Sequence, residues 1–334
     1  LSVEGEMFKS YRGWKFPEDW EVEGFCMESP KLFYKDGYYY LTLAEGGTAG
    51  PATSHMVVSL RSKSLKGNWE ISPYNPIVHT ESREEKWWSK GHGTLVDNPE
   101  GDWWIIYHAY EKGFHTLGRQ TLLEPVEWTA DGWYKLAEDS DPAKVIKKPA
   151  GEKVEHGFNF SDDFTDDSLG SQWLFHKDSQ DRYTLTGTSL VMEGRGELPG
   201  DSLPLLCNSG KHAYQYSIDL EVDDNAEAGL ILFYNSDWYC AIGLNNKKVY
   251  TMIRGNKSEA NINSNKCRLK IVNNNHVVSF YYWNKSEWQQ LGLTLETSGY
   301  NHNTFGDFLS LKPGIFVCKN GKAEFKNFTF KSLE

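Results

Sequence analysis

The chain has 334 residues, 39% of them hydrophobic, and a formal net charge of −11. Since a globular domain usually runs about 100–200 residues, this length predicts two domains. The negative charge argues against nucleic acid and against a membrane as partners, because both are anionic, and a neutral or cationic ligand fits better. No apolar run approaches the roughly 18 residues that span a bilayer, and the first residues have no signal-peptide pattern.

Strand signals dominate the whole chain. Short aromatic and β-branched runs are broken by Asp-Gly and Asn-Gly turns, as in "FYKDGYYYLTL", and no long run has helical periodicity. The predicted fold class is therefore all-β. Residues 1–16 have strand character but no partner hairpin in front of them.

Two similar units follow between residues 29 and 136, at a period of roughly 60 residues. In the first unit "PKLFYKDGYYYLTLAEG" precedes "MVVSLRSKSLKGNWEIS", and in the second "GTLVDNPEGDWWIIYHAY" precedes "LGRQTLLEPVEWTADGWYKL". Each unit predicts four antiparallel strands, which is typical of a β-propeller blade. Residues 1–16 are then interpreted as the tail of an earlier blade, so the chain would begin in the middle of a domain.

A change of character marks the boundary between the two domains. Residues 137–157 are charged, contain two prolines and lack aromatic residues, which predicts a linker. About a dozen short alternating strands follow without helices, and they indicate a two-sheet β-sandwich. We place part of a propeller in residues 1–148 and a sandwich domain in residues 155–334.

Aromatic residues are abundant, with 13 Trp, 18 Tyr and 17 Phe. Their rings can stack on the apolar faces of sugars, although we expect most of them to fill β cores. The five cysteines show no metal or redox spacing, and free thiols are favoured over one or two disulfides in the second half of the chain.

No sequence motif requires a cofactor. The glycine-rich "AEGGTAG" lacks phosphate-loop spacing, and there is no HExxH, GxSxG or EF-hand pattern. The acidic cluster around Asp163, which also includes Asp162, Asp166 and Asp167, could supply oxygens to a structural Ca²⁺ ion or could simply form a solvated turn.

Glu28 is the first candidate for chemistry. It lies between Cys26-Met27 and Ser29-Pro30, in a loop that enters the first blade strand, where propeller loops line the central channel. Apolar neighbours disfavour the ionised form of a carboxyl group, and a carboxylic acid that stays protonated near neutral pH can act as a general acid. The alternative is an ordinary glutamate in a salt bridge.

His92 and Arg119 are the next candidates. His92 occupies the matching entry position of the second unit, and its flanking glycines allow a close approach of the backbone. Its imidazole could coordinate an axial cation or water, or it could be a core histidine. Arg119 could hold sugar hydroxyls and the carboxylate of Glu28, with His115 as a further substrate-binding candidate, or it could form a structural salt bridge.

Several motifs in the same order resemble the latter half of the five-bladed propeller of glycoside hydrolase family 43. They are "ESPKLFYKDGYYYLTLAEGG", "KSLKGNWE", "NPIVHT", "KGHGTLVDNPEGDWWIIYHAY" and "LGRQTLLEPVEW". The segment that opens with "FSDDF" and contains "GLILFYNSDWYCAIGL" is similar to the C-terminal concanavalin-like, jelly-roll module often fused to such propellers. The resemblance implies an exo-acting β-xylosidase or α-L-arabinofuranosidase that works on plant cell-wall polysaccharide.

The resemblance also implies residue roles. The family hydrolyses glycosides with inversion at the anomeric carbon. It uses an Asp as general base, a second Asp that tunes the acid and a Glu as general acid. Inversion requires the acid and base carboxyl groups to lie about 6.5–9.5 Å apart, so that a water molecule fits between the base and the anomeric carbon. Glu28 falls on the acid position, although the usual Glu-Gly-Pro is here Glu-Ser-Pro. His92 matches the axial histidine and Arg119 matches the arginine of the sugar subsite, whereas both aspartates fall upstream of Leu1 in the family pattern.

We therefore expect this chain to carry the acid without the base. A piece of a longer enzyme is favoured over an inactive protein, and the alternative function is a non-catalytic carbohydrate-binding protein. The expected partners are an oligosaccharide or polysaccharide, together with the missing blades or a second copy of the chain, because unpaired blade edges invite association. The nature of the substrate predicts a secreted or periplasmic location.

Overall fold

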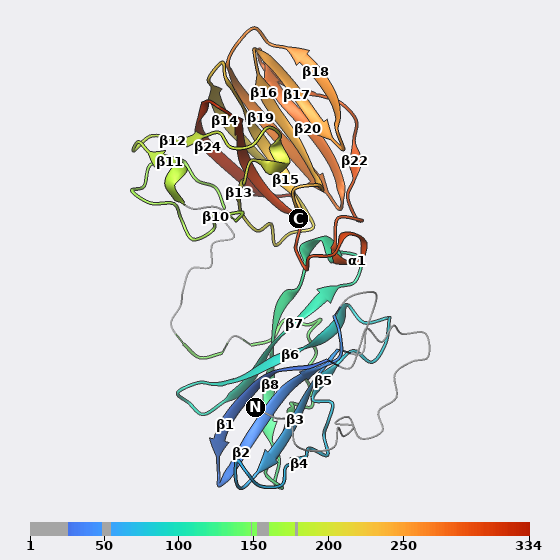
Figure 1. Ribbon diagram of the computed structural model, residues 1–334. Coiled ribbons are helices and arrows are strands. Elements are labelled where there is room, and N and C mark those ends of the chain that lie inside the picture. The colour runs from blue at the N-terminus through green and yellow to red at the C-terminus, as the bar shows by residue number, and fades with distance from the viewer. Residues whose placement is uncertain (1–25, 49–54, 148, 152–159, 178–179) are drawn as a thin grey trace. The chain divides into compact units, whose positions relative to one another are not determined.

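The computed structural model describes residues 26–48, 55–147, 149–151, 160–177 and 180–334 (Figure 1). The predicted tail at residues 1–16 lies outside these ranges, as do residues 152–157 of the predicted linker. The chain divides into two compact units, Leu1–His115 with Arg119–Val154, and Thr116–Gly118 with Glu155–Glu334.

The first unit contains two antiparallel sheets, as the two predicted blades require. One sheet has the order β1-β2-β3-β4 with β5 paired to β3, and the other has the order β6-β7-β8-β9. The strands are β1 (Met27–Lys35), β2 (Tyr38–Glu45), β3 (Met56–Ser62), β4 (Glu70–Ile71), β5 (Val78–His79), β6 (Trp87–Asp97), β7 (Trp103–Glu111), β8 (Gln120–Trp128) and β9 (Tyr134–Leu136). The 3-10 helix η1 (His115–Leu117) falls on the boundary between the two units.

Local turn chemistry explains the first hairpin. Asp36 and Gly37 join β1 to β2 with φ values of 49° and 85°. Positive φ at both central residues is the property of the two-residue turn that Asp-Gly favours, because its twist matches that of the strands.

Aromatic rings fill the core of the first unit, as expected for most of them. Tyr40 is 1% exposed and stacks on Phe33 with a centroid distance of 5.1 Å, while Trp128 meets Tyr40 edge-on at 5.1 Å. The Tyr40 hydroxyl donates to the carbonyl oxygen of Gly132. Because these rings come from both sheets, the burial of each large side chain, about 1.5–3 kcal/mol, holds the two blades together.

The second unit is the predicted two-sheet sandwich. A seven-stranded sheet has the order β10-β13-β23-β15-β16-β17-β18, and an eight-stranded sheet has the order β11-β12-β24-β14-β19-β20-β21 with β22 paired to β20. The strands are β10 (Leu174–Phe175), β11 (Tyr183–Leu185), β12 (Leu190–Glu193), β13 (Leu205–Leu206), β14 (Ala213–Val222), β15 (Ala226–Phe233), β16 (Tyr239–Asn245), β17 (Lys248–Ile253), β18 (Asn256–Asn261), β19 (Lys266–Asn274), β20 (Val277–Asn284), β21 (Glu287–Gln290), β22 (Leu295–Glu296), β23 (Lys312–Lys319) and β24 (Lys322–Ser332). The short helical segments are η2 (Gln180–Arg182), η3 (Pro199–Asp201) and α1 (His302–Phe305).

Within the described ranges, no helix has the length and apolar character needed to cross a membrane.

The central strands of the seven-stranded sheet are buried on both faces. All eight residues of β15 are buried, whereas β14 of the other sheet alternates between buried and more exposed residues. Leu230 faces the main core between the sheets, and Ile231 faces a second apolar cluster on the opposite side, where η3 contacts β15 and β23.

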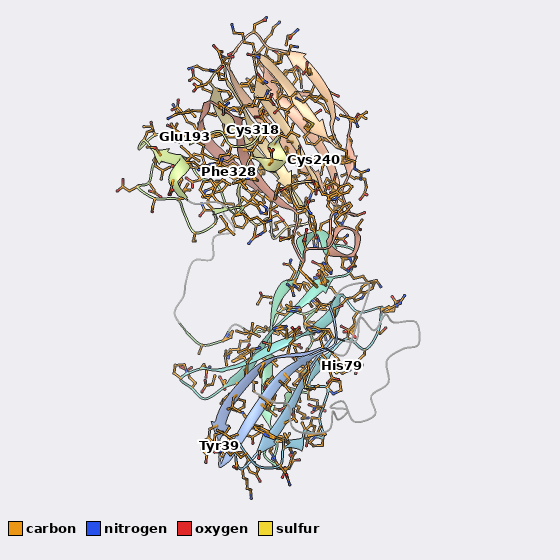
Figure 2. All side chains as sticks on the ribbon, in the orientation of Figure 1. Tyr39, His79, Glu193, Cys240, Cys318 and Phe328 are labelled. Atoms are coloured by element: carbon orange, nitrogen blue, oxygen red, sulfur yellow. The ribbon has the colours of Figure 1, made fainter. Side chains whose placement is uncertain are left out.

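The cysteines are free thiols, in agreement with the favoured prediction. Cys240 lies in the main core and Cys318 in the second cluster (Figure 2). Cys207 is also buried, whereas Cys26 is exposed and Cys267 is intermediate.

Candidate active site

Glu28 and His92 lie close together, as their matching positions in the two units predicted. The Glu28 Oε1 atom is 3.8 Å from Nδ1 of His92, and the two side chains are 55% and 33% exposed. This separation exceeds a direct hydrogen bond. A ligand hydroxyl or a water molecule could therefore bridge the two groups.

Irregular strands aim both side chains. The β1–β2 register shifts between Glu28 and Lys31, and the β6–β7 register shifts on either side of Gly91. Ser29 and His92 have φ values of 53° and 61°, in the left-handed region that side chains other than glycine rarely occupy. Bulges and strained residues of this kind redirect side chains and are common at functional sites.

The glycines beside His92 permit a close approach of β6 to its neighbours, as predicted. A Cβ atom at Gly91 would lie 2.2 Å from Cδ2 of His55. A Cβ atom at Gly93 would lie 2.7 Å from Cδ1 of Ile105 and 2.9 Å from Cγ2 of Val57. Only glycine fits at these two positions without displacing its neighbours.

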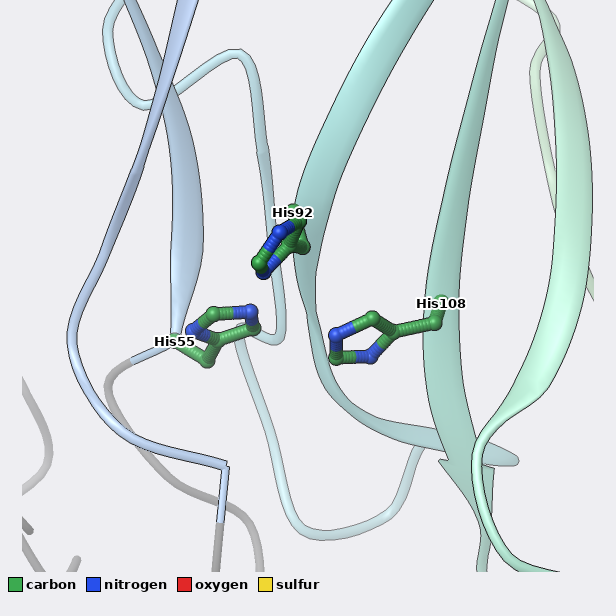
Figure 3. Close-up of side chains that lie close together, drawn as sticks. All are labelled: His55, His92 and His108. Carbon is green, nitrogen blue, oxygen red and sulfur yellow. The ribbon is translucent and has the colours of Figure 1, made fainter. Parts of the chain in front are cut away.

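Three histidines gather at this point, of which the sequence analysis identified only His92 (Figure 3). His55 precedes β3, His92 lies on β6 and His108 lies on β7. The rings of His55 and His108 stack with centroids 5.2 Å apart, and the ring of His92 is 5.5 Å from that of His108. One signal for His108 was present in the sequence, because this polar residue interrupts the apolar run "WWIIYHAY".

Burial keeps the three imidazoles neutral at neutral pH. Burial first, and then the neighbouring imidazoles and Arg119, lower the pKa of His55 to about 4 and that of His108 to about 3. The pKa of His92 is lowered chiefly by burial, then by the charges of Lys31 and Arg119, while Glu28 opposes the shift. The contact between His92 and Glu28 at pH 7 is therefore one between a neutral ring and a carboxyl group.

Arg119 lies near the three histidines. Its proximity is seen in the effect of its positive charge, which lowers the pKa of each imidazole. His115 has other ring neighbours in the described part of the chain. Its ring lies 5.7 Å from that of Trp88 and 5.4 Å from that of Tyr110. A substrate contact of His115 stays a prediction.

The expected apolar enclosure of Glu28 is wrong for the residues that the structure describes. The Glu28 side chain is 55% exposed, Met27 is 47% exposed and Cys26 is exposed as well. The reason is geometric, because neighbours along an extended segment project away from one another and do not cover the residue between them.

The donor chemistry of the three histidines decides which cation fits. Their ring nitrogens lie within 4.8 Å of one another, and neither nitrogen of His108 has a hydrogen-bond partner among the described residues. Neutral imidazoles suit transition metals, whereas Ca²⁺ takes oxygen ligands.

The acidic cluster is engaged in local structure. Oδ1 of Asp163 accepts hydrogen bonds from the amide and the hydroxyl of Thr165. Asp162 accepts from the amide of Phe164 and from the indole of Trp173. Ca²⁺ at Asp163 stays a prediction.

The arrangement combines a proton donor with neutral and cationic hydrogen-bond donors. The carboxyl group of Glu28 can deliver a proton to a leaving oxygen, and the guanidinium of Arg119 with the imidazole of His92 can hold sugar hydroxyls. A propeller unit with this set of groups, followed by a β-sandwich, defines the class of modular glycoside hydrolases.

The chain carries the domain of glycosyl hydrolases family 43 and belongs to the proteins with the beta xylosidase C-terminal concanavalin A-like domain, whose profile matches more than half of it. The profile of family 43 matches residues 1–134, and the profile of the beta xylosidase C-terminal concanavalin A-like domain matches residues 161–331. Both parts of the resemblance seen in the sequence are thereby confirmed.

Several known proteins are similar to this chain in sequence or in structure. A xylosidase/arabinosidase of Butyrivibrio fibrisolvens is 28% identical over 326 residues, which cover 88% of this chain and 61% of that protein. A non-reducing end alpha-L-arabinofuranosidase of Bacteroides ovatus, BoGH43B, is 31% identical over 60% of this chain and 40% of its own length. The crystal structure of the GH43 protein BlXynB from Bacillus licheniformis has a TM-score of 0.82 and 26% identity, and covers 98% of this chain and 68% of that one. The chain thus spans less than two thirds of the two curated relatives.

Proposed function

We propose that this protein is part of an exo-acting, inverting glycosidase that removes terminal xylose or arabinofuranose from plant cell-wall saccharides. The observation that carries the proposal is the contact between the carboxyl group of Glu28 and the neutral imidazole of His92, 3.8 Å apart, with the charge of Arg119 nearby. The names of the two relatives, a xylosidase/arabinosidase and an arabinofuranosidase, support this substrate class.

In this mechanism Glu28 protonates the glycosidic oxygen as the bond to the leaving group breaks. Inversion also needs a carboxylate base about 6.5–9.5 Å from the acid, so that a water molecule fits between the base and the anomeric carbon. We assign only the acid here. Polymeric cell-wall substrates further support a secreted or periplasmic location.

The decisive experiment replaces Glu28 by glutamine in an enzyme that also carries the base. We expect turnover of unactivated xylobiose or arabinobiose to fall about 10²–10⁴-fold, because proton transfer contributes that much, and turnover of 2,4-dinitrophenyl glycosides to change little, because that leaving group needs no proton. Proton NMR of the first product formed should show the inverted anomer. Equal losses on both substrates, or a retained anomer, would contradict the assignment.

We also propose that the three imidazoles are a divalent transition-metal site, for which their neutral nitrogen donors provide the support. Elemental analysis of the protein dialysed against Zn²⁺ or Mn²⁺ should show an ion that His108→Ala loses and that the control His212→Ala keeps. Binding of Ca²⁺ that is lost in Asp163→Asn would point to the acidic cluster.

A second candidate function is carbohydrate binding without catalysis. The specific observation is a group of rings on the outer face of the eight-stranded sheet, where Trp283 is 37% exposed and meets Trp288 edge-on at 5.3 Å. The Nζ atom of Lys270 lies 4.2 Å from the centroid of Trp288 and 4.9 Å from that of Tyr281. Exposed rings beside hydrogen-bond donors can stack on sugars.

Calorimetric titration of the whole chain with xylan, arabinan and galactan oligosaccharides tests this candidate. Binding that Trp283→Ala abolishes and Glu28→Gln retains would place it on the sandwich. Absence of heat with every sugar would remove this candidate function.

A further inference from the structure

Glu28 lies on β1 at an irregular turn of the strand, and this turn holds a strained residue. Ser29 has a φ of 53°, and the strand register breaks between Glu28 and Lys31. An L-residue with a side chain is unfavourable in this left-handed region, which glycine occupies freely. Such a conformation persists only where neighbouring groups hold it.

Lys31 provides the contacts that hold this turn. Its Nζ atom donates to the carbonyl oxygen of Ser29 at 3.1 Å and also to the Ser29 hydroxyl. The ammonium is partly buried, and burial lowers the pKa of Lys31. Its charge also lies close enough to His92 to lower the pKa of that imidazole. One side chain thus touches the strained residue and lies beside the ring that faces Glu28.

We propose that Lys31 is a positioning residue for the general acid. By fixing Ser29 in the left-handed conformation, its ammonium aims the carboxyl group of Glu28 at His92. The two hydrogen bonds to Ser29 occupy donors of the ammonium, which favours this role over a contact with the substrate. The catalytic consequence rests on the proposed function, whereas the geometry of the turn does not.

Lys35 offers a matched control for the test. It lies on the same strand, and its Nζ atom is 2.6 Å from Oδ2 of Asp36 at the opposite end of β1. Lys31→Met and Lys35→Met remove the same charge from the same strand and keep an apolar stem. Ser29→Gly removes the backbone strain, and Ser29→Ala keeps the strain but removes the hydroxyl acceptor.

In kinetics with an enzyme that also carries the base, Lys31→Met should lower kcat on xylobiose or arabinobiose about 10–100-fold, equivalent to about 1.4–2.7 kcal/mol. The same variant should change kcat on 2,4-dinitrophenyl glycosides by less than about 3-fold, because that leaving group needs no proton. Lys35→Met should leave both activities unchanged. In a Ser29→Gly background, adding Lys31→Met should cost less than about 3-fold on either substrate, because glycine adopts the left-handed conformation without strain.

Equal losses on both substrates, an equal loss in Lys35→Met, or no rescue by Ser29→Gly would overturn the proposal. Crystal structures of the wild type and Lys31→Met decide the geometry independently of activity. We expect Ser29 to leave the left-handed region and the separation between Glu28 and His92 to widen beyond 3.8 Å. An unchanged turn in Lys31→Met would refute the positioning role, whereas a wild-type protein without glycosidase activity would refute only the proposed function.

Discussion

Replacing Gly91 by alanine tests how closely β6 must approach the histidine that precedes β3. The added Cβ atom would lie 2.2 Å from Cδ2 and 2.5 Å from Nε2 of His55. The His55 ring has little freedom to retreat, because the residue is fully buried and its Nδ1 atom is 2.7 Å from the carbonyl oxygen of Gly46.

The cost can be worked out from these contacts. Overpacking of a buried site costs about 1–3 kcal/mol, and rotating the ring away from its hydrogen bond adds about 1 kcal/mol. The first unit should therefore lose about 2–4 kcal/mol. For a unit of this size each kcal/mol lowers the melting temperature by about 2–4 °C, which predicts a decrease of about 4–16 °C.

Differential scanning calorimetry of the whole chain would measure this shift in the transition of the first unit. Gly299→Ala is a suitable control, because no atom lies within 4 Å of the place that its added Cβ atom would take, and its φ is not positive. The control should change stability by no more than about 0.5 kcal/mol. A Gly91→Ala protein that melts within about 1 °C of the wild type would refute the packing argument.

Three further predictions concern stability and reactivity. The pKa values of His55 and His108 in the folded protein, about 4 and about 3, lie below the unfolded value of 6.5. The unfolded state therefore binds more protons than the folded state, and the stability that is present above pH 6.5 is lost as the pH falls. Urea unfolding in EDTA should show about 2–4 kcal/mol less stability at pH 5 than at pH 7, and equal stabilities would contradict the lowered values. Tyr40→Phe keeps the ring stack but removes a hydroxyl donor, and it should cost about 1 kcal/mol by the urea midpoint. With a thiol reagent, Cys26 should react first and Cys267 slowly, because the pKa of Cys267 is raised to about 11, and the buried thiols should react only after unfolding.

Local signals were sufficient to predict the architecture from the sequence. Asp-Gly turns and the repeated hairpin pairs specify the blades, and alternation without helices specifies the sandwich, because these features depend on residues close in the chain. The approach of Glu28 to His92 followed from their matching positions in the two units.

Other parts of the site depend on contacts between distant strands. His55 and His108 meet only because β3, β6 and β7 lie side by side, which no local pattern encodes. The expected enclosure of Glu28 failed because sequence neighbours such as Met27 project elsewhere. The left-handed φ of Ser29 gives a physical reason why glycine is usual at this position in the resembling family.

The burial of both faces of the central strands in the seven-stranded sheet has a consequence for how the second unit can change over time. A strand such as β15, with no residue facing water, has no position at which a substitution is free of packing consequences. Strand β14 keeps alternate positions open to solvent. Substitutions during evolution should therefore accumulate mainly at the exposed positions of the eight-stranded sheet, and new surface sites in the sandwich should arise there. The amide hydrogens of β15 should be among the slowest to exchange with solvent.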